Sequence, residues 1–354
     1  MKKTIGIISS ILMIAALLTA FAGCSKKEEA QPAPEPVAVT SGKALSSFAS
    51  ADDVTGTEFT VASVEDLVKL SEFVAAGEDF SGCSIKQIAD IDMNPGLPVL
   101  DESKNFIGDD AKLFNFKPIG NNTDDSAIFS GTYDGNGKVI RGLYINIKEK
   151  KKGIGLFGKT VEAVIRNVTL VDAYITVDES MKAKDLSRHG SIIGLALDTT
   201  VEGCYSDAFV NGPWLGPKGA DAVNEEHPEL NLVPNAQGDD CYGSEYIGGI
   251  VGRDDGESII RNCVFAGKLY DAYGSCGGII GRGGDSEVSN CLVTGKVECP
   301  SGSAAINGKA SGEGNYAVEN AASDMNDAEI ISASQISAYA NTVKIGGYDV
   351  LKMK

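Results

Sequence analysis

Short apolar runs separated by glycine or asparagine recur between about residues 150 and 300. Four similar strings open the repeats: Gly155–Gly158, Ser191–Gly194, Gly248–Gly252 and Gly277–Gly281. A turn residue follows the last glycine of each string after 9 or 10 residues: Asn167, Gly203, Asn262 and Asn290. The runs are too short for helices, so the pattern predicts short β-strands joined by tight turns.

One such repeat cannot bury its apolar face alone, whereas stacked repeats can. We therefore predict an all-β fold, a parallel β-helix in which Ile, Val, Leu and Phe point inward and stack on their copies. A leucine-rich-repeat horseshoe needs a Leu-x-x-Leu-x-Leu frame that these repeats lack, and a propeller needs longer blades.

About residues 60–354 resemble the GLUG-motif repeat family of bacterial surface proteins, which includes β-helix lipoproteins and adhesin-like proteins. Phe116–Gly120 is similar to the family's W-x-P-I-G turn, with Phe in place of Trp, and Phe129–Ile140 precedes the repeats. Val61–Met93 resembles the opening segment, and Asn315–Val318 with Gly346–Leu351 the closing one. The resemblance implies a right-handed, pectin-lyase-like β-helix and adhesion or glycan contact, and it supplies no catalytic residues.

The N-terminus has the pattern of a bacterial lipoprotein signal. Lys2 and Lys3 precede an apolar run, and Ala22 and Gly23 stand directly before Cys24. We expect a signal peptide over residues 1–23 and a lipid anchor on Cys24, carrying diacylglycerol and palmitate. An uncleaved membrane helix is the alternative. Because Ser25 is not acidic, a cell-envelope location at the outer membrane or cell surface is favoured.

The rest of the chain divides by composition. Residues 24–50, rich in Lys, Glu, Ala, Pro and Ser, predict a flexible tether. Residues 51–115 predict a cap and first strands, with a capping helix from Val64 to Ala76 that begins at a Ser63/Asp66 capping box. Residues 116–310 hold the repeats with an insert at 212–246, and 311–354 close the fold, with a second helix at Ile330–Ala340.

Charge limits the partners. The chain has a formal net charge of −18, and loss of Lys2 and Lys3 with the signal makes it −20, so nucleic acid is not an expected partner. Lys159, Arg253 and Arg282 each follow the last glycine of a repeat, which predicts a basic column that could grip acidic sugars. A solvated turn whose charges are compensated by nearby aspartates is the alternative.

Aromatic residues gather in and beside the insert. Trp214, the single tryptophan, and Tyr242 and Tyr246 are candidate ligand-binding residues, because aromatic rings stack on sugar faces. Packing of the insert against the repeats is the alternative. Long loops on rigid scaffolds often carry function.

The cysteines fall into two groups. Cys204, Cys263 and Cys291 directly follow the turn residue of successive repeats, so they should form an inward ladder of buried, reduced thiols. Such a line cannot surround a metal ion tetrahedrally, and we expect neither metal nor cofactor. A disulfide is possible among a second group, which leaves the pairing open: Cys83, Cys241, Cys276 and Cys299.

The function that these features favour is a non-enzymatic binding or adhesion module for a glycan or protein ligand. A polysaccharide lyase or hydrolase is the first alternative, because Asp124, His189 and Asp239-Asp240 resemble fragments of the polygalacturonase signature, although in a different order and spacing. The chain contains no His-Glu-x-x-His motif. A structural envelope spacer is the second alternative.

Overall fold

The computed structural model describes residues 42–120, 126–148, 153–178, 187–212, 244–271, 275–299, 303–306 and 311–354. All of them belong to one compact unit, Thr40–Lys354. Its core begins at Leu45 and includes residues from every sheet of the stack, so this unit contains its own hydrophobic core.

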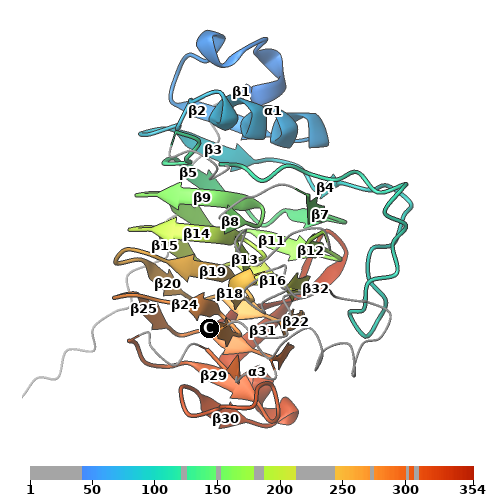
Figure 1. Cartoon of the computed structure of the whole chain (residues 1–354), viewed down its shortest axis with the longest axis vertical. Coiled ribbons are helices and arrows are strands. Elements are labelled where there is room, and N and C mark those ends of the chain that lie inside the picture. Colours follow the sequence, from blue (N-terminus) through green and yellow to red (C-terminus); the bar gives the residue numbers. More distant parts are fainter. Residues whose placement is uncertain are drawn as a thin grey trace, which may run out of the picture. The chain divides into compact units, whose positions relative to one another are not determined.

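Among the described residues, the strands form five parallel sheets and one antiparallel hairpin. We name the parallel sheets A to E in the order in which the chain visits them (Figure 1). Sheet A contains β1 (Lys43–Ala44), β2 (Glu58–Val61), β3 (Ser84–Gln87), β5 (Thr132–Asp134), β10 (Val164–Arg166), β15 (Thr200–Glu202), β20 (Ile259–Arg261) and β25 (Glu287–Ser289). Sheet B contains β4 (Ile91–Asp92), β6 (Val139–Arg141), β11 (Thr169–Val171), β16 (Tyr205–Ser206), β21 (Val264–Phe265), β26 (Leu292–Val293), β29 (Tyr316–Val318) and β30 (Glu329–Ile331).

The other three sheets are shorter. Sheet C contains β7 (Tyr144–Ile147), β12 (Tyr174–Val177), β17 (Phe209–Gly212), β22 (Lys268–Asp271) and β27 (Lys296–Glu298). Sheet D contains β8 (Gly153–Ile154), β13 (Ser187–Gly190), β18 (Ser244–Gly248), β23 (Ser275–Gly277) and β28 (Ser303–Ala304). Sheet E contains β9 (Phe157–Val161), β14 (Ile193–Leu197), β19 (Val251–Asp254) and β24 (Ile280–Arg282).

The chain passes through the sheets in the same order on each turn, so it forms a solenoid of stacked coils. Strands β5 to β9 form one coil, and β10 to β14 lie on it in register. A parallel, mostly-β solenoid was predicted from the repeats, and the strand order shows it. The inward residues Tyr133, Ile165, Val201, Ile260 and Val288 stack in sheet A, at separations of 32, 36, 59 and 28 residues along the chain.

The turn from sheet A to sheet B repeats the predicted asparagine and glycine positions. Asn167, Asn262 and Asn290 have φ of 55°, 58° and 49°, and Gly203 has 63°. Asparagine and glycine tolerate this left-handed backbone better than other residues. The amide of Asn290 also donates a hydrogen bond to Asn262 Oδ1, at 2.6 Å, so one turn side chain supports the next.

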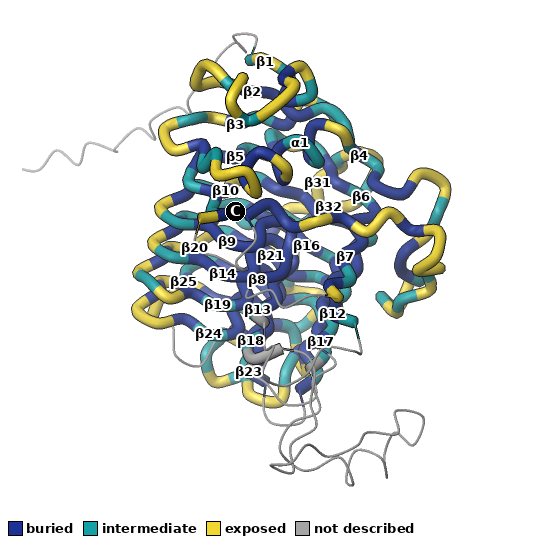
Figure 2. The backbone as a smooth tube through the Cα atoms, turned by 45° about the horizontal axis from the view of Figure 1, so that its top comes forward, coloured by how far each residue is buried: buried dark blue, intermediate teal, exposed yellow. Residues whose placement is uncertain are grey.

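Helix α1 (Val64–Ala75) is one residue shorter than predicted. Ser63 Oγ accepts a hydrogen bond from Asp66 N at 3.2 Å, and Asp66 Oδ2 in turn accepts from Ala62 N at 2.9 Å. Leu67, Leu70 and Phe73 are buried on one face, which joins the core beside β2. In Figures 1 and 2 this helix lies near the N-terminal end of the stack.

Two sequence predictions about the ends differ in part from the structure. Residues 42–50 are not all tether, because β1 and the 3₁₀-helix η1 (Leu45–Ser47) lie there and Leu45 is fully buried; a second 3₁₀-helix, η2 (Ala51–Asp53), follows. The C-terminal helix predicted over Ile330–Ala340 is shorter: Glu329–Ile331 is strand β30, which pairs with β29, and the helical part consists of η5 (Ala333–Gln335) and α3 (Ile336–Tyr339).

A C-terminal hairpin, β31 (Ala340–Ile345) and β32 (Tyr348–Met353), packs on the outer face of sheet B. The outward residues of that sheet are apolar there: Val139, Val171, Tyr205, Val264 and Leu292. Lys352 reaches the A–B turn, where its ammonium donates to the Gly203 carbonyl at 2.5 Å. No helix in the described parts of the chain is both long and apolar enough to cross a membrane.

Candidate functional site

The residues of the predicted basic column occupy the same register position on successive strands of sheet E. Lys159, Leu195, Arg253 and Arg282 are consecutive partners across β9, β14, β19 and β24 of sheet E. Leu195 interrupts the column of positive charges, because β14 is a regular strand whose residue at this position is apolar. The structure therefore aligns the three basic residues but brings only the two arginines next to each other.

The two arginines are half-buried and are engaged by neighbouring side chains. Both guanidinium groups lie 5.0 Å from the centre of the Tyr246 ring, and Arg282 Nη1 donates a hydrogen bond to the Tyr246 hydroxyl. Arg253 Nε also pairs with the Asp255 carboxylate. Lys159 is buried. The half-buried Tyr246 thus holds arginines of two coils rather than offering an open face.

A cavity of about 400 Å³ beside this cluster has an excess of acidic residues. Besides the two arginines, its lining includes Asp198, Asp254, Asp255, Glu257 and Asp285. Asp254 is buried and accepts hydrogen bonds from Ser258 Oγ at 2.6 Å and Ser286 Oγ at 2.8 Å. These charges compensate the arginines, so the cavity does not favour an acidic sugar. Trp214 and Tyr242 lie outside the described residues.

The cysteine ladder lies in the core. Cys204, Cys263 and Cys291 are buried, and the carbonyl two residues before each is the nearest acceptor for its thiol, at 3.3–3.5 Å, with a carbonyl of the preceding coil at 3.8–3.9 Å. Burial raises the pKa of Cys204 and Cys263 well above the ordinary value, so these thiols stay protonated. Of the second group, Cys83 is half-buried, Cys276 and Cys299 are buried, and Cys241 lies outside the described residues.

The histidine of the polygalacturonase-like fragments, His189, lies in the core. His189 is fully buried between Ile154 and Ile247 of the neighbouring coils, and burial lowers its pKa to about 3. A residue in that position cannot reach a polysaccharide on the surface. Asp124 and the Asp239-Asp240 pair lie outside the described residues. Within the described ranges, no group of three His, Cys, Asp or Glu side chains is arranged to hold a metal ion.

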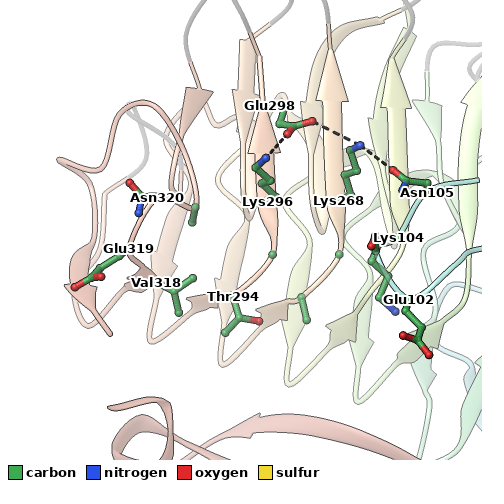
Figure 3. Close-up of a pocket in the computed structure, with 15 residues that line it drawn as sticks. Glu102, Lys104, Asn105, Lys268, Thr294, Lys296, Glu298, Val318, Glu319 and Asn320 are labelled. Atoms are coloured by element: carbon green, nitrogen blue, oxygen red, sulfur yellow. Dashed lines mark hydrogen bonds and ion pairs between the residues drawn. The ribbon is translucent and has the colours of Figure 1, made fainter. Parts of the chain in front are cut away.

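A larger cavity, of about 610 Å³, lies where sheet B turns into sheet C over the last coils (Figure 3). We call it the corner cavity. Small residues line the turns of two successive coils: Ala266 and Gly267, then Thr294 and Gly295. The remaining lining is mostly charged or amide-bearing: Glu102, Ser103, Lys104, Asn105, Lys268, Lys296, Glu298, Val318, Glu319, Asn320 and Ala321.

Two lysines of adjacent coils meet in this cavity. Lys268 of β22 and Lys296 of β27 are register partners, and both ammonium groups approach Glu298, at 3.7 Å and 2.6 Å. The hydrogen bond from Lys296 lowers the pKa of Glu298. Lys268 also donates to Asn105 Oδ1 at 3.1 Å and lies 5.2 Å from the centre of the Phe209 ring. Its ammonium is therefore held in place before any ligand arrives.

The lysines continue an aromatic column on the outer face of sheet C. Tyr144, Tyr174, Phe209, Lys268 and Lys296 are consecutive register partners. The first two are covered by Phe106, whose ring stacks on Tyr174 with 4.2 Å between ring centres. Phe106 belongs to the loop of residues 94–116, which we call the arm.

The arm forms one wall of the corner cavity because two aspartates of the stack hold it. Asp172 Oδ1 accepts hydrogen bonds from Leu100 N at 2.7 Å and Val99 N at 3.3 Å. Lys104 Nζ pairs with Asp207 Oδ2 at 2.6 Å. The arm thereby reaches from the coil of β4 to the coils of β12 and β17, which places Glu102 to Asn105 beside the lysines.

Sequence reasoning missed this site, although part of its signal was present. Lys268 and Lys296 each stand six residues after a turn asparagine, Asn262 and Asn290, in the matching strings Ala-Gly-Lys-Leu and Thr-Gly-Lys-Val. That spacing predicts a lysine pair on one face. Asn105 of the arm is 163 residues from Lys268 in sequence, and no local pattern places it there.

No family model matches the chain. Halomucin from Haloquadratum walsbyi is 35% identical over 89 residues, which are 25% of this chain, and the chain spans about 1% of halomucin's length. A solved structure of a candidate immunoglobulin A1 protease from Bacteroides ovatus is 17% identical, with a TM-score of 0.46, and the alignment covers 83% of this chain and 92% of that one. These likenesses do not assign the chain to a family.

Proposed function

We propose that this chain is a surface binding module of the GLUG type, anchored to a membrane by lipid on Cys24, and that its corner cavity binds a glycan. The coils would form a right-handed β-helix closed by α1 at its N-terminal end. No cofactor takes part in this function. The observation that carries the proposal is the corner cavity itself, in which charged and amide side chains of several coils converge over a floor of small residues.

The shape of the cavity suits a linear oligomer. Its lining comes from the B–C turns of successive coils, which are spaced by about 4.8 Å in a β-structure. A floor of Ala266, Gly267, Thr294 and Gly295 leaves room for a chain that lies along the stack axis. The polar side chains on both sides can then hydrogen-bond to the hydroxyl groups of successive sugars.

The size of the cavity favours a glycan over a protein partner. About 610 Å³ lies in the range of small-ligand sites, roughly 300–1,000 Å³. A stable protein interface buries about 800 Å² on each partner and is centred on aromatic or arginine anchors. The described lining of the corner cavity holds neither an aromatic ring nor an arginine.

Binding without turnover is the outcome that the cavity supports. A glycosidase needs a carboxylic acid whose raised pKa lets it donate a proton. Glu298 is the carboxylate closest to both lysines, and its pKa is lowered by the hydrogen bond from Lys296, so it stays ionised. A structural spacer would not need an arm held against three coils.

The test is a glycan array probed with residues 40–354, followed by calorimetric titration of the retained sugars and a product assay. We expect retention without product. Lys268→Ala should weaken binding about tenfold or more, because it removes the pre-positioned ammonium. Lys344→Ala, on the hairpin, is the matched control and should bind as the parent does. The proposal fails if the array retains no glycan, or if Lys268→Ala binds equally well.

A further inference from the structure

Building on the proposed glycan function, we infer that the ligand of the corner cavity is an acidic glycan of the uronic-acid class, and that Glu298 occupies the position of a ligand carboxylate. The inference comes from the way the two lysines share one carboxylate that belongs to the protein (Figure 3). It names the ligand class of the same site.

Glu298 shows that a carboxylate fits between the two ammonium groups. It stands two residues after Lys296 on the same strand, so both side chains leave the same face of sheet C. Its Oε1 lies 2.6 Å from Lys296 Nζ, whereas its Oε2 lies 3.7 Å from Lys268 Nζ. The first distance is a hydrogen bond and the second is beyond one.

Lys268 therefore keeps capacity for a second anion. An ammonium group has three hydrogens, and Asn105 Oδ1 accepts one at 3.1 Å. The Phe209 ring lies beneath the group, and the Lys268 side chain is only 24% exposed, so its position is fixed and partly desolvated. A ligand carboxylate arriving from the cavity would complete the partners of this lysine.

The charges on the walls favour a ligand carboxylate beside the lysines and disfavour one elsewhere in the cavity. Lys268 and Lys296 stand on adjacent coils, about 4.8 Å apart along the stack. Lys104 of the arm adds a third ammonium, paired with Asp207. Charge-assisted hydrogen bonds are about twice as strong as neutral ones, so carboxylates would gain more here than hydroxyls. Glu102 and Glu319 also line the cavity and would disfavour a ligand with excess negative charge.

An acidic peptide also presents carboxylates, but the lining suits a sugar better. Ser103, Asn105, Thr294 and Asn320 supply uncharged donors and acceptors among the lysines. Such a mixture matches a ring that carries one carboxylate and several hydroxyls. The floor of small residues accommodates a continuous chain of rings rather than side chains on a separate backbone.

The test compares two probes that differ only in charge: a short oligogalacturonate and the same oligomer with its carboxyl groups reduced to alcohols. Titration into residues 40–354 should give an affinity for the acidic oligomer at least about tenfold higher than for the reduced one. Glu298→Gln should tighten binding of the acidic oligomer about three- to tenfold, because it removes the competing carboxylate but keeps the side-chain shape. Lys296→Gln should weaken that binding about tenfold and change the reduced oligomer little.

Each other outcome overturns a defined part of the account. The inference is contradicted if the two oligomers bind with equal affinity, or if the Glu298→Gln variant binds the acidic oligomer more weakly than the parent does. The proposed function would still stand in that case if the protein retains a neutral glycan on the array. An oligoglutamate that competes as well as the oligogalacturonate contradicts the glycan class. Lys344→Gln controls for general loss of positive charge, and circular dichroism of each variant shows that it is folded.

Discussion

His189 gives the sharpest prediction about stability. The imidazole is fully buried, and its pKa in the folded protein is lowered to about 3, because burial disfavours the charged form more strongly than a hydrogen bond with the Asn211 backbone favours it. In the unfolded chain a histidine has a pKa of about 6.5. Between these two values the unfolded state binds a proton that the folded state does not, so the free energy of unfolding must fall as the pH falls below about 6.5.

The size of the effect follows from the separation of the two pKa values. Each pH unit between them changes stability by about 1.4 kcal/mol, so lowering the pH from 7 to 4.5 should remove about 2–3 kcal/mol through this residue alone. The total free energy of unfolding of a domain is commonly about 5–15 kcal/mol, so this loss is a measurable part of it. His189→Gln keeps a donor for the Asn211 backbone but does not titrate. Between pH 7 and pH 4.5 the free energy of unfolding of this variant should therefore fall by about 2–3 kcal/mol less than that of the parent.

Urea unfolding of residues 40–354, followed by circular dichroism at pH 7 and pH 4.5, measures this difference. His227→Gln removes the other histidine of the chain and separates its contribution. Nuclear magnetic resonance of the imidazoles gives an independent reading, since the His189 signal should not move between pH 8 and pH 5. The reasoning is refuted if His189 titrates near pH 6.5, or if parent and His189→Gln lose equal stability in acid.

Three further predictions concern the hairpin, the arm and the anchor. Lys352→Ala should cost about 1–3 kcal/mol, because it removes the ammonium that donates to the Gly203 carbonyl; hydrogen exchange should rise in residues 340–353, and unchanged protection would contradict this. Phe106→Ala should lower the free energy of unfolding by about 1–3 kcal/mol by urea denaturation, while its exposed neighbour Ile107→Ala should change it by less than about 0.5 kcal/mol; equal effects would show that the arm does not pack as described. Cys24→Ser should move the protein from the membrane fraction to the soluble fraction, with the lipid mass missing from the N-terminal peptide; a variant that stays in the membrane excludes this anchor.

The repeats predict the stack of coils because the residues that define each turn and each inward position are neighbours in the sequence. Asn167, Asn262 and Asn290 mark the same turn, and the cysteine after Gly203, Asn262 and Asn290 points inward in each coil. A turn residue with positive φ and an inward residue directly after it fix the register of each strand that follows. The same regularity aligns Arg253 with Arg282.

The position of the arm and the structure of the C-terminal segment could not be predicted, because both depend on contacts between segments that are distant in sequence. The arm is held by Asp172 and Asp207, which belong to later coils, so its place beside Lys268 cannot be derived from its own residues. The predicted C-terminal helix is shortened for a similar reason. Ile330 and Ile331 pair with β29 and extend sheet B, and this pairing outweighs the helical preference of the segment, which is helical only at 333–339.

The contacts of the two arginines were equally hard to foresee. A glycine followed by a basic residue suggests an exposed column, but Tyr246 of β18 lies against both Arg253 and Arg282. That contact joins sheet D to sheet E, and it becomes visible only when five strands per coil are known. The positive charges that line the corner cavity lie instead on Lys268 and Lys296, whose outward direction follows from their place on sheet C.

A crystal structure of residues 40–354 with the oligosaccharide that binds most tightly on the array tests the central claim most directly. The account predicts that the sugar chain lies in the corner cavity along the stack axis, within hydrogen-bond distance of Lys268 and Lys296. An oligosaccharide bound at the Arg253–Arg282 cluster, or anywhere else on the molecule with the corner cavity empty, would contradict it.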